Sequence, residues 1–401
     1  MISVAEAEHI IMSQPGDFGK EMISFDKALG RILAEDIIAD RDLPPCSRAT
    51  MDGIAIKYDA IEQGIKTFTI IKTQAAADRP TQINSLTECV EIMTGAALDD
   101  TTDTVIRYED LEVKGSLATL LEAGIKKGQN IHCKGIDKKQ NELIIAANTR
   151  ITPATIGILA SIGKTQVLVR KNPKIVIIST GDELVPADEI PEQWQIRSSN
   201  APTIHAVLEQ HGINALMLHL PDEPEVMTEA LNRCLNEYEV LIISGGVSMG
   251  KFDHIPSILA SLAVSKLLHK VQQRPGKPFW FGKHKNGAVV FAFPGNPVSA
   301  FMCLHRYFLP WLHKSMTGRY CDKLYGVLDK ELTFIPPLQY FLQVKLSMND
   351  AGCLVALPVE GNGSGDFVNL AGSHAFMELP SEQTNFKKGA VYPIWPFKQM
   401  I

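Results

Sequence analysis

Several features of membrane, secreted and zinc-binding proteins are missing from this sequence of 401 residues. No apolar run approaches the roughly 18 residues that a membrane-spanning helix needs. The start, MISVAEAEHIIMSQ, lacks the basic stretch followed by an apolar stretch that marks a secretory signal. The seven cysteines form no CxxC pair, and no HExxH motif occurs. We therefore expect a cytoplasmic protein with reduced thiols, no membrane association and no structural zinc.

An excess of positive charge is missing as well. The 39 lysines and arginines stand against 45 aspartates and glutamates, giving a net charge of −6 and a pI near 6.0. Nucleic-acid-binding proteins usually carry a basic patch or stripe, so we expect no nucleic-acid partner. A local basic pocket for a small anion remains compatible with this balance.

The length and the changing character of the chain predict a multidomain α+β and α/β protein. Helical periodicity predicts helices over 3–12, over 24–38 with Ser24 as cap, and over 152–163. Strand–helix alternation from Pro173 predicts a mostly parallel sheet covered by helices. The predicted domains are a helical and linker domain (1–44 and 143–170), an inserted β-rich domain (45–142), an α/β domain (171–318) and a C-terminal β domain (319–401).

Three predicted strands of the α/β domain end in unusual turns, in KIVIISTGDEL, VLIISGGVSMGKFD and FAFPGNPVSA. Ligands of parallel sheets bind at the carboxyl ends of the strands. Glycines allow close approach of the backbone, and their N–H groups together with a helix start can hold an anion. The candidate anion-binding residues of these turns are Ser179, Thr180, Gly181, Ser244, Gly245, Gly246, Ser248, Pro294, Gly295, Asn296 and Pro297.

Two carboxylates follow these turns closely. Glu183 and Asp253 lie where a divalent cation that bridges a bound anion can sit, and hard oxygen ligands suit Mg²⁺. The alternative is that the turns are ordinary tight turns and that Asp253 caps a helix. Any single turn favours this alternative, whereas three at corresponding strand ends favour a ligand site. Neither G-x-G-x-x-G nor the P-loop motif occurs at these turns, so we expect neither a dinucleotide site nor a P-loop.

The segment HKVQQRPGKPFWFGK places Lys270, Arg274 and Lys277 within eight positions. On a solvated hairpin these cations would be plain surface charge. Beside two anion-binding turns they favour a funnel for anions. Asp52 in TMDGIAI and Thr94 in IMTGAA stand at ordinary turn pairs, and their residue types alone do not indicate function.

The order and separation of ATMDGIAI, IMTGAA, STGDEL, SGGVSMGKFD, RPGKPFWFGK and FPGNPVSA closely resemble the molybdopterin molybdenumtransferase family, which includes the E domain of gephyrin. The resemblance covers nearly the whole chain. It implies that molybdate is inserted into adenylylated molybdopterin with Mg²⁺, that AMP is released and that molybdenum cofactor forms. It also implies a homodimer, a C-terminal β barrel, and the adenylyltransferase that supplies the substrate as a candidate partner.

The same resemblance implies site residues. The implied catalytic residues are Asp52, Thr94, Asp137, Glu183, Asp222, Lys270 and Lys277. The resemblance also implies that Asp253 contributes to the cleft and that Ser364, in EGNGSGDF, binds substrate. Three departures stand out: Arg274 replaces a lysine of bacterial members, His132-Cys133-Lys134 replaces an arginine-rich run, and Ile136 replaces an acidic residue. Cleavage of a phosphoanhydride needs a positioned water and charge stabilisation, so we expect no covalent role for a serine or cysteine.

Two other functions are compatible with parts of this pattern. A molybdopterin adenylyltransferase shares the α/β domain, and a scaffold would resemble the receptor-anchoring E domain of gephyrin. The β-rich regions on either side argue against the first alternative. The intact set of Glu183, Asp253 and Lys277 argues against a scaffold without activity. The sequence does not decide between molybdate and tungstate.

Overall fold

The computed structural model describes residues 1–121, 124–247, 253–361 and 363–398. The chain folds into two compact structural units. The first unit comprises Met1–Ala34, Arg150–Thr152 and Val167–Ile401, and the second comprises Glu35–Thr149 and Pro153–Gln166. The four domain boundaries predicted from the sequence stay a prediction. None of the helices in the described ranges has the length and apolar character that a bilayer crossing requires.

The second unit is built around a six-stranded sheet with the order β7-β4-β6-β5-β9-β8. Its strands are β4 (Gly53–Ile56), β5 (Thr67–Gln74), β6 (Glu88–Ile92), β7 (Thr104–Arg107), β8 (Leu111–Lys114) and β9 (Leu117–Leu120). Successive residues of a strand point to opposite faces. Ile54 and Ile56 accordingly pack into one core with Phe68, while Ala55 packs with Val90 into another. The β-rich character expected for this region is therefore confirmed.

Smaller elements complete the second unit. They are the helices α2 (Asp59–Glu62) and α3 (Pro153–Ser161), the 3-10 turn η2 (Tyr108–Asp110), and the paired short strands β2 (Ile37–Ile38) with β11 (Leu143–Ile145) and β3 (Arg48–Ala49) with β10 (Ile131–His132). Helix α3 confirms the helix predicted over 152–163. Gly163 follows this helix with φ +69°, a conformation that glycine adopts readily at a helix end.

The first unit contains a six-stranded sheet with the order β16-β13-β17-β21-β20-β18. Its strands are β13 (Ile175–Thr180), β16 (Ala215–Leu220), β17 (Val240–Ser244), β18 (Val264–His269), β20 (Trp280–His284) and β21 (Val289–Phe293). The pairs of β13 with β16, β13 with β17 and β17 with β21 are parallel, while β20 pairs antiparallel with both of its neighbours. The mostly parallel sheet predicted from strand–helix alternation is thus confirmed.

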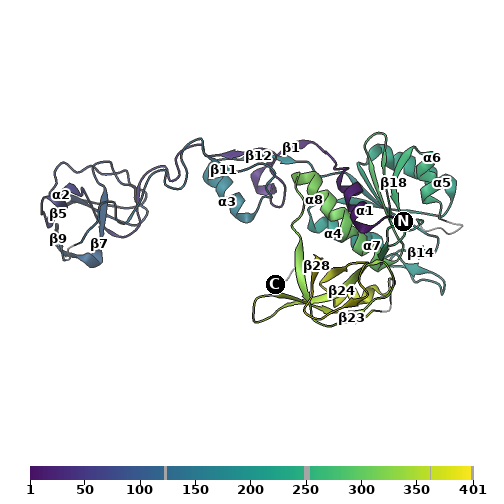
Figure 1. Cartoon of the computed structure of the whole chain (residues 1–401). Helices are drawn as coiled ribbons and strands as arrows, with labels where there is room; N and C mark the ends of the chain where they lie inside the picture. Colours follow the sequence, from purple (N-terminus) through teal and green to yellow (C-terminus); the bar gives the residue numbers. More distant parts are fainter. Residues whose placement is uncertain (122–123, 248–252, 362, 399–401) are drawn as a thin grey trace. The chain divides into compact units, whose positions relative to one another are not determined.

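Helices cover both faces of this sheet (Figure 1). On one face lie α1 (Val4–Met12), α4 (Asn200–Gln210), α7 (Pro297–Cys303), the π-helix η3 (Leu304–Phe308) and α8 (Leu309–Thr317). On the other face lie α5 (Pro224–Glu237) and α6 (Ile255–Ser261). Ile242 of β17 packs under the first group and Ile243 under the second. Strands buried on both faces explain why the sequence shows unbroken apolar runs here rather than alternation.

The helix expected over 24–38 is wrong. The 3-10 turn η1 (Phe25–Lys27) and the short strand β2 form there instead, and Gly30 lies between them with φ +79°. Ile32 and Leu33 then form single β-bridges to Arg150 and Val169, which are distant in sequence, and both side chains are buried there. A positive-φ glycine ends helical structure easily, and the bridges satisfy the backbone of the apolar residues that suggested a helical face.

The last part of the first unit is a closed five-stranded barrel. Its strands follow the order β24-β25-β22-β28-β26, and β26 pairs back to β24. They are β22 (Leu324–Leu328), β24 (Gln339–Met348), β25 (Leu354–Pro358), β26 (Ala375–Leu379) and β28 (Val391–Pro396). The short strand β19 (Gln273–Arg274) adds to β24 from outside the barrel. This barrel confirms the expected C-terminal β domain.

Other short elements of the first unit are β1 (Lys20–Ser24) with β12 (Gln166–Arg170), β14 (Leu184–Val185) with β15 (Ile196–Arg197), β23 (Leu332–Thr333) with β27 (Asn385–Phe386), and the 3-10 turn η4 (Phe367–Ala371).

Candidate functional site

Three neighbouring strand tips of the parallel sheet form the centre of the candidate site. Ser179 of β13 lies opposite Ser244 of β17, and Ser244 lies opposite Phe293 of β21. The turns that follow these strands therefore leave the same edge of the sheet side by side. The structure brings together the three turns that the sequence singled out.

Two glycines shape the middle turn. Gly245 has φ +102° and Gly246 has φ +64°. A Cβ atom on Gly245 would lie 2.8 Å from the carbonyl oxygen of Thr180, and one on Gly246 would lie 3.1 Å from its hydroxyl oxygen. That hydroxyl is buried and has no hydrogen-bond partner among the described residues. The middle turn can therefore pack this closely against the first only with glycine at these positions.

Asn200 connects the middle turn to the third turn. Its Nδ2 atom donates to the Ser244 hydroxyl over 2.8 Å and to the Gly295 carbonyl over 2.6 Å. Asn200 is the first residue of α4. Sequence reasoning missed this residue, because an asparagine at the start of a helix has a ready structural explanation there.

A loop beyond β25 reaches the third turn. Asn296 donates from Nδ2 to the Ser364 hydroxyl over 2.8 Å, and the Val298 N–H donates to the Ser364 carbonyl over 3.2 Å. The proline at position 297 begins α7, where its missing N–H costs no helical hydrogen bond. Ser364 thus stands beside the turn PGNP, although the sequence linked it to the site only by resemblance.

Two of the three predicted cations lie at this site. Arg274 and Lys277 line the cleft, and neither forms an ion pair with a carboxylate in the described part of the chain. The Arg274 guanidinium lies 5.8 Å from the centre of the Phe334 ring, a cation–π arrangement. Lys270 does not line the cleft. Its backbone has φ +67° and its N–H donates to the Phe279 carbonyl.

Carboxylates gather beside the first turn. The Asp222 N–H donates to Asp182 Oδ1 over 3.1 Å, and a Cβ on Gly181 would lie 2.5 Å from a Glu183 carboxylate oxygen. Burial raises the pKa of Asp222, and the charges of Asp182 and Glu183 raise it further. Repulsion among these carboxylates is the kind of charge imbalance that a bound cation relieves.

One open cleft of about 1080 Å³ joins these features. Among the predicted residues that line it are Ser179, Thr180, Gly181, Glu183, Asp222, Ser244, Gly245, Gly246, Asp253, Arg274, Lys277, Pro294, Gly295, Asn296, Pro297 and Ser364. Arg197, which sequence reasoning also missed, lines the cleft as well. Ser248 lies outside the described residues. The roles assigned to all these residues stay predictions.

The remaining predicted residues belong to the second unit. Asp52 Oδ1 accepts hydrogen bonds from the Thr94 N–H over 2.6 Å and from the Thr94 hydroxyl over 2.7 Å. These two bonds lower the pKa of Asp52. Asp137 lies 3.0 Å from Nε2 of His132, a member of the divergent run in the sequence. The structure thus brings Asp52 and Thr94 into direct contact.

These features define an α/β protein with a glycine-lined cleft at the carboxyl ends of a parallel sheet, in which two cations without ion-pair partners among the described residues lie with grouped carboxylates. Comparison with known proteins shows to which family of α/β proteins the chain is similar. Residues 2–163 match the MoeA N-terminal region (domain I and II), residues 176–314 match a probable molybdopterin binding domain, and residues 325–397 match the MoeA C-terminal region (domain IV).

Two curated relatives are named molybdopterin molybdenumtransferase. The Synechocystis protein is 38% identical over 398 residues, which cover 98% of this chain and 100% of the relative. The Staphylococcus epidermidis protein (strain RP62A) is 30% identical over 400 residues, with 98% and 95% covered. The MoeA crystal structure from Pyrococcus horikoshii aligns over 100% of both chains with a TM-score of 0.83 and 27% identity. The chain therefore belongs to the molybdopterin molybdenumtransferase (MoeA) family.

Proposed function

We propose that this chain inserts molybdate into adenylylated molybdopterin, releases AMP and forms molybdenum cofactor. The observation that carries the proposal is the composition of this cleft: a glycine-rich turn, two cations without ion-pair partners among the described residues, and a group of carboxylates. The matching regions on both sides of the α/β part favour this reaction over simple adenylylation of molybdopterin.

The reaction brings together two negatively charged reactants, so charge stabilisation is its main requirement. Molybdate is a dianion, and the adenylylated pterin carries a pyrophosphate. The Gly246 N–H can hold a phosphate oxygen, whereas the Gly245 N–H already donates to the Phe293 carbonyl over 3.2 Å. Arg274 can bind an oxyanion through two N–H groups at once, and Lys277 supplies a point charge. With the substrates fixed in this way, a positioned water completes the cleavage of the phosphoanhydride without a protein nucleophile.

The residues of the cleft fit a magnesium ion. The described residues contain no cluster of three or more metal-binding side chains. Mg²⁺ does not need one, because it typically takes one or two carboxylates and completes its shell with waters and substrate phosphates. Glu183 and Asp253 would hold the ion, at the edge of the cleft where carboxylates repel one another. When bound, Mg²⁺ supplies positive charge to the phosphate oxygens.

Further parts of the proposal rest on the family membership. We propose that the protein is a cytoplasmic homodimer and that it receives its substrate from a molybdopterin adenylyltransferase. Asp52, Thr94 and Asp137 remain candidate catalytic residues because they match motif positions of the family. Lys270 remains a candidate on the same ground, although it does not line the cleft.

The decisive experiment incubates the pure protein with adenylylated molybdopterin, Mg²⁺ and molybdate, and measures AMP release together with cofactor formation. We expect both products to depend on molybdate and on Mg²⁺. A parallel reaction with molybdopterin and ATP tests the adenylyltransferase alternative, for which we expect no adenylylated product. Absence of AMP release in the first reaction, or adenylylation in the second, would contradict the proposal.

A further inference from the structure

The turn that carries Arg274 and Lys277 is closed by a buried side chain that neither the motifs nor the family comparison singled out. Gln273 is fully buried, and its Nε2 atom donates to the Gly276 carbonyl over 2.9 Å. Gly276 has φ +89°, and a Cβ atom there would lie 2.8 Å from the Met302 side chain. The side-chain amide of Gln273 therefore bridges the two ends of the turn on its buried side, where the turn packs against α7.

Tyr307 holds this amide in one orientation. Its hydroxyl donates to Oε1 of Gln273, and its ring stacks on Phe279 with centroids 4.8 Å apart. Tyr307 is fully buried, and burial raises the pKa of its hydroxyl, so the hydroxyl stays protonated. If the amide were flipped, Oε1 would face the Gly276 carbonyl, and two acceptors would meet in a buried place. Only the observed orientation satisfies both partners.

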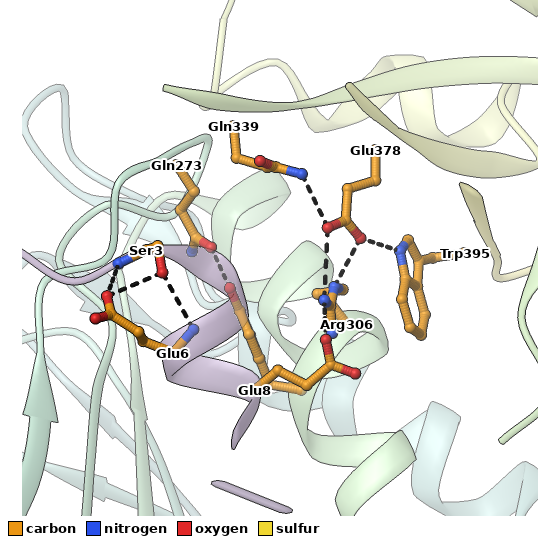
Figure 2. A network of polar contacts seen from close by, with 9 residues as sticks. Ser3, Glu6, Glu8, Gln273, Arg306, Gln339, Glu378 and Trp395 are labelled. Carbon is orange, nitrogen blue, oxygen red and sulfur yellow. Dashed lines mark hydrogen bonds and ion pairs between the residues drawn. The ribbon is translucent and has the colours of Figure 1, made fainter. Parts of the chain in front are cut away.

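Arg306, the neighbour of Tyr307 on η3, connects η3 to the barrel (Figure 2). Arg306 donates to Glu378 of β26 over 2.9 Å and to Glu8 of α1 over 2.7 Å. Gln339 of β24 donates to Glu378 over 3.0 Å. Residue 339 also lies opposite Gln273 in the parallel pair of β24 with β19. The segment thus contacts the turn directly through Tyr307, and it is linked to the strand beside the turn indirectly, through Arg306 and Glu378.

We propose that Tyr307 and Gln273 are positioning residues that set the place of Arg274 and Lys277 in the cleft. The proposal rests on the proposed function, because it takes these two cations as the anion ligands. Both cations are exposed and lack ion-pair partners in the described structure, so no carboxylate fixes them. The location of Lys277 follows from the backbone of the turn, and that of Arg274 follows from this backbone together with the Phe334 ring. The buried amide and hydroxyl hold that backbone. A displacement of the order of 1 Å is enough to weaken catalysis severely.

The test compares two tyrosine variants that lose the same kind of bond. Tyr307→Phe removes the hydroxyl that binds Gln273. The matched control, Tyr392→Phe, removes a hydroxyl that donates to the Gln383 side chain over 3.2 Å in the barrel, outside the cleft. Three quantities are measured: the molybdate concentration at half-maximal AMP release, kcat, and hydrogen–deuterium exchange of residues 274–279. Thermal unfolding of both variants gives the structural cost of each lost bond.

We expect Tyr307→Phe to need roughly tenfold more molybdate and to exchange faster in the turn. Tyr392→Phe should match the wild type in both respects even if its Tm falls equally. Gln273→Met should reproduce the effect of Tyr307→Phe, and the double variant should be no worse than the more severe single variant, because both act through one contact.

Two results would overturn the positioning role. One is wild-type molybdate dependence in Tyr307→Phe, and the other is unchanged exchange of the turn in that variant. The exchange measurement also separates this inference from the proposed function. If the wild type releases no AMP, the proposed function fails, while faster exchange in Tyr307→Phe alone still supports the positioning role.

Discussion

Lys277→Ala is the perturbation that tests the anion cleft most directly. Lys277 lines the cleft, is exposed, and has no ion-pair partner among the described residues, so its full charge is available to a ligand. The substitution removes this charge from a turn whose backbone is held by Gln273. We therefore expect the backbone of the turn to stay in place and the loss to fall on anion binding.

The magnitude follows from the position of the ammonium group. Two unit charges 4 Å apart attract by about 1 kcal/mol in water and by about 4 kcal/mol at the effective dielectric constant near a protein surface. A charge-assisted hydrogen bond contributes roughly 1.5–3 kcal/mol, which lies between these limits. This range corresponds to roughly ten- to hundredfold weaker apparent affinity. The loss should also exceed that produced by added salt in the wild type, because a cleft is screened less than an open surface.

The assay titrates molybdate, and separately adenylylated molybdopterin, while AMP release is measured. Lys266→Ala is the matched control, since Lys266 is an exposed residue of β18 that does not line the cleft. It should behave as the wild type. Arg274→Lys should be milder than Lys277→Ala, because the charge persists and mainly the contact with Phe334 changes. If Lys277→Ala titrates and turns over like Lys266→Ala, the RPGKP segment is an ordinary solvated turn.

Three further predictions concern metal, assembly and stability. Asp253→Ala should abolish Mg²⁺-dependent AMP release with an unchanged circular dichroism spectrum, and full activity with normal Mg²⁺ dependence would remove Asp253 from the metal site. Light scattering at micromolar concentration should give the mass of a dimer, and a monomer would contradict the homodimer proposed from family membership. Arg306→Met should lower the free energy of unfolding by about 3–5 kcal/mol in a urea titration, because it leaves Glu378 with a buried, uncompensated charge; a loss below about 1 kcal/mol would refute that reasoning.

The sequence predicts those parts of the site whose structure depends on residues that are neighbours in the chain. Unbroken apolar runs identified β13, β17 and β21 as buried strands. Glycines directly after such strands predicted an anion-binding turn, and the role of these glycines stays a prediction. The structure shows that Gly245 packs closely against Thr180, which the sequence did not indicate. Parallel pairing then follows from strand–helix alternation. These inferences need only the residues of one turn and its flanking elements.

The parts that sequence could not predict depend on contacts between distant residues. Asn200 reaches Gly295, 95 positions away, and Tyr307 reaches Gln273, 34 positions away. No local pattern marks such pairs. Lys270 was grouped with Arg274 because the two lie close in sequence, yet only Arg274 lines the cleft. The helix expected over 24–38 failed for the same reason, since β-bridges to distant segments bury Ile32 and Leu33.

The opposite charges of the cleft are useful only if they stay apart. No ion pair within 4.0 Å joins Arg274 or Lys277 to Glu183 or Asp222 in the described structure. Such a pair would neutralise both groups and leave weaker sites for an anion and for a cation.

The separation has a structural basis, because the carboxylates follow the sheet while the cations sit on a turn attached to the barrel through β19. The buried Arg306–Glu378 pair joins the helix that holds this turn to the same barrel. A buried ion pair often stabilises a fold no better than apolar residues of the same volume. In this protein the pair connects the segment that contacts the cation-bearing turn with β26 of the barrel, on the side of the cleft away from the carboxylates of the first turn.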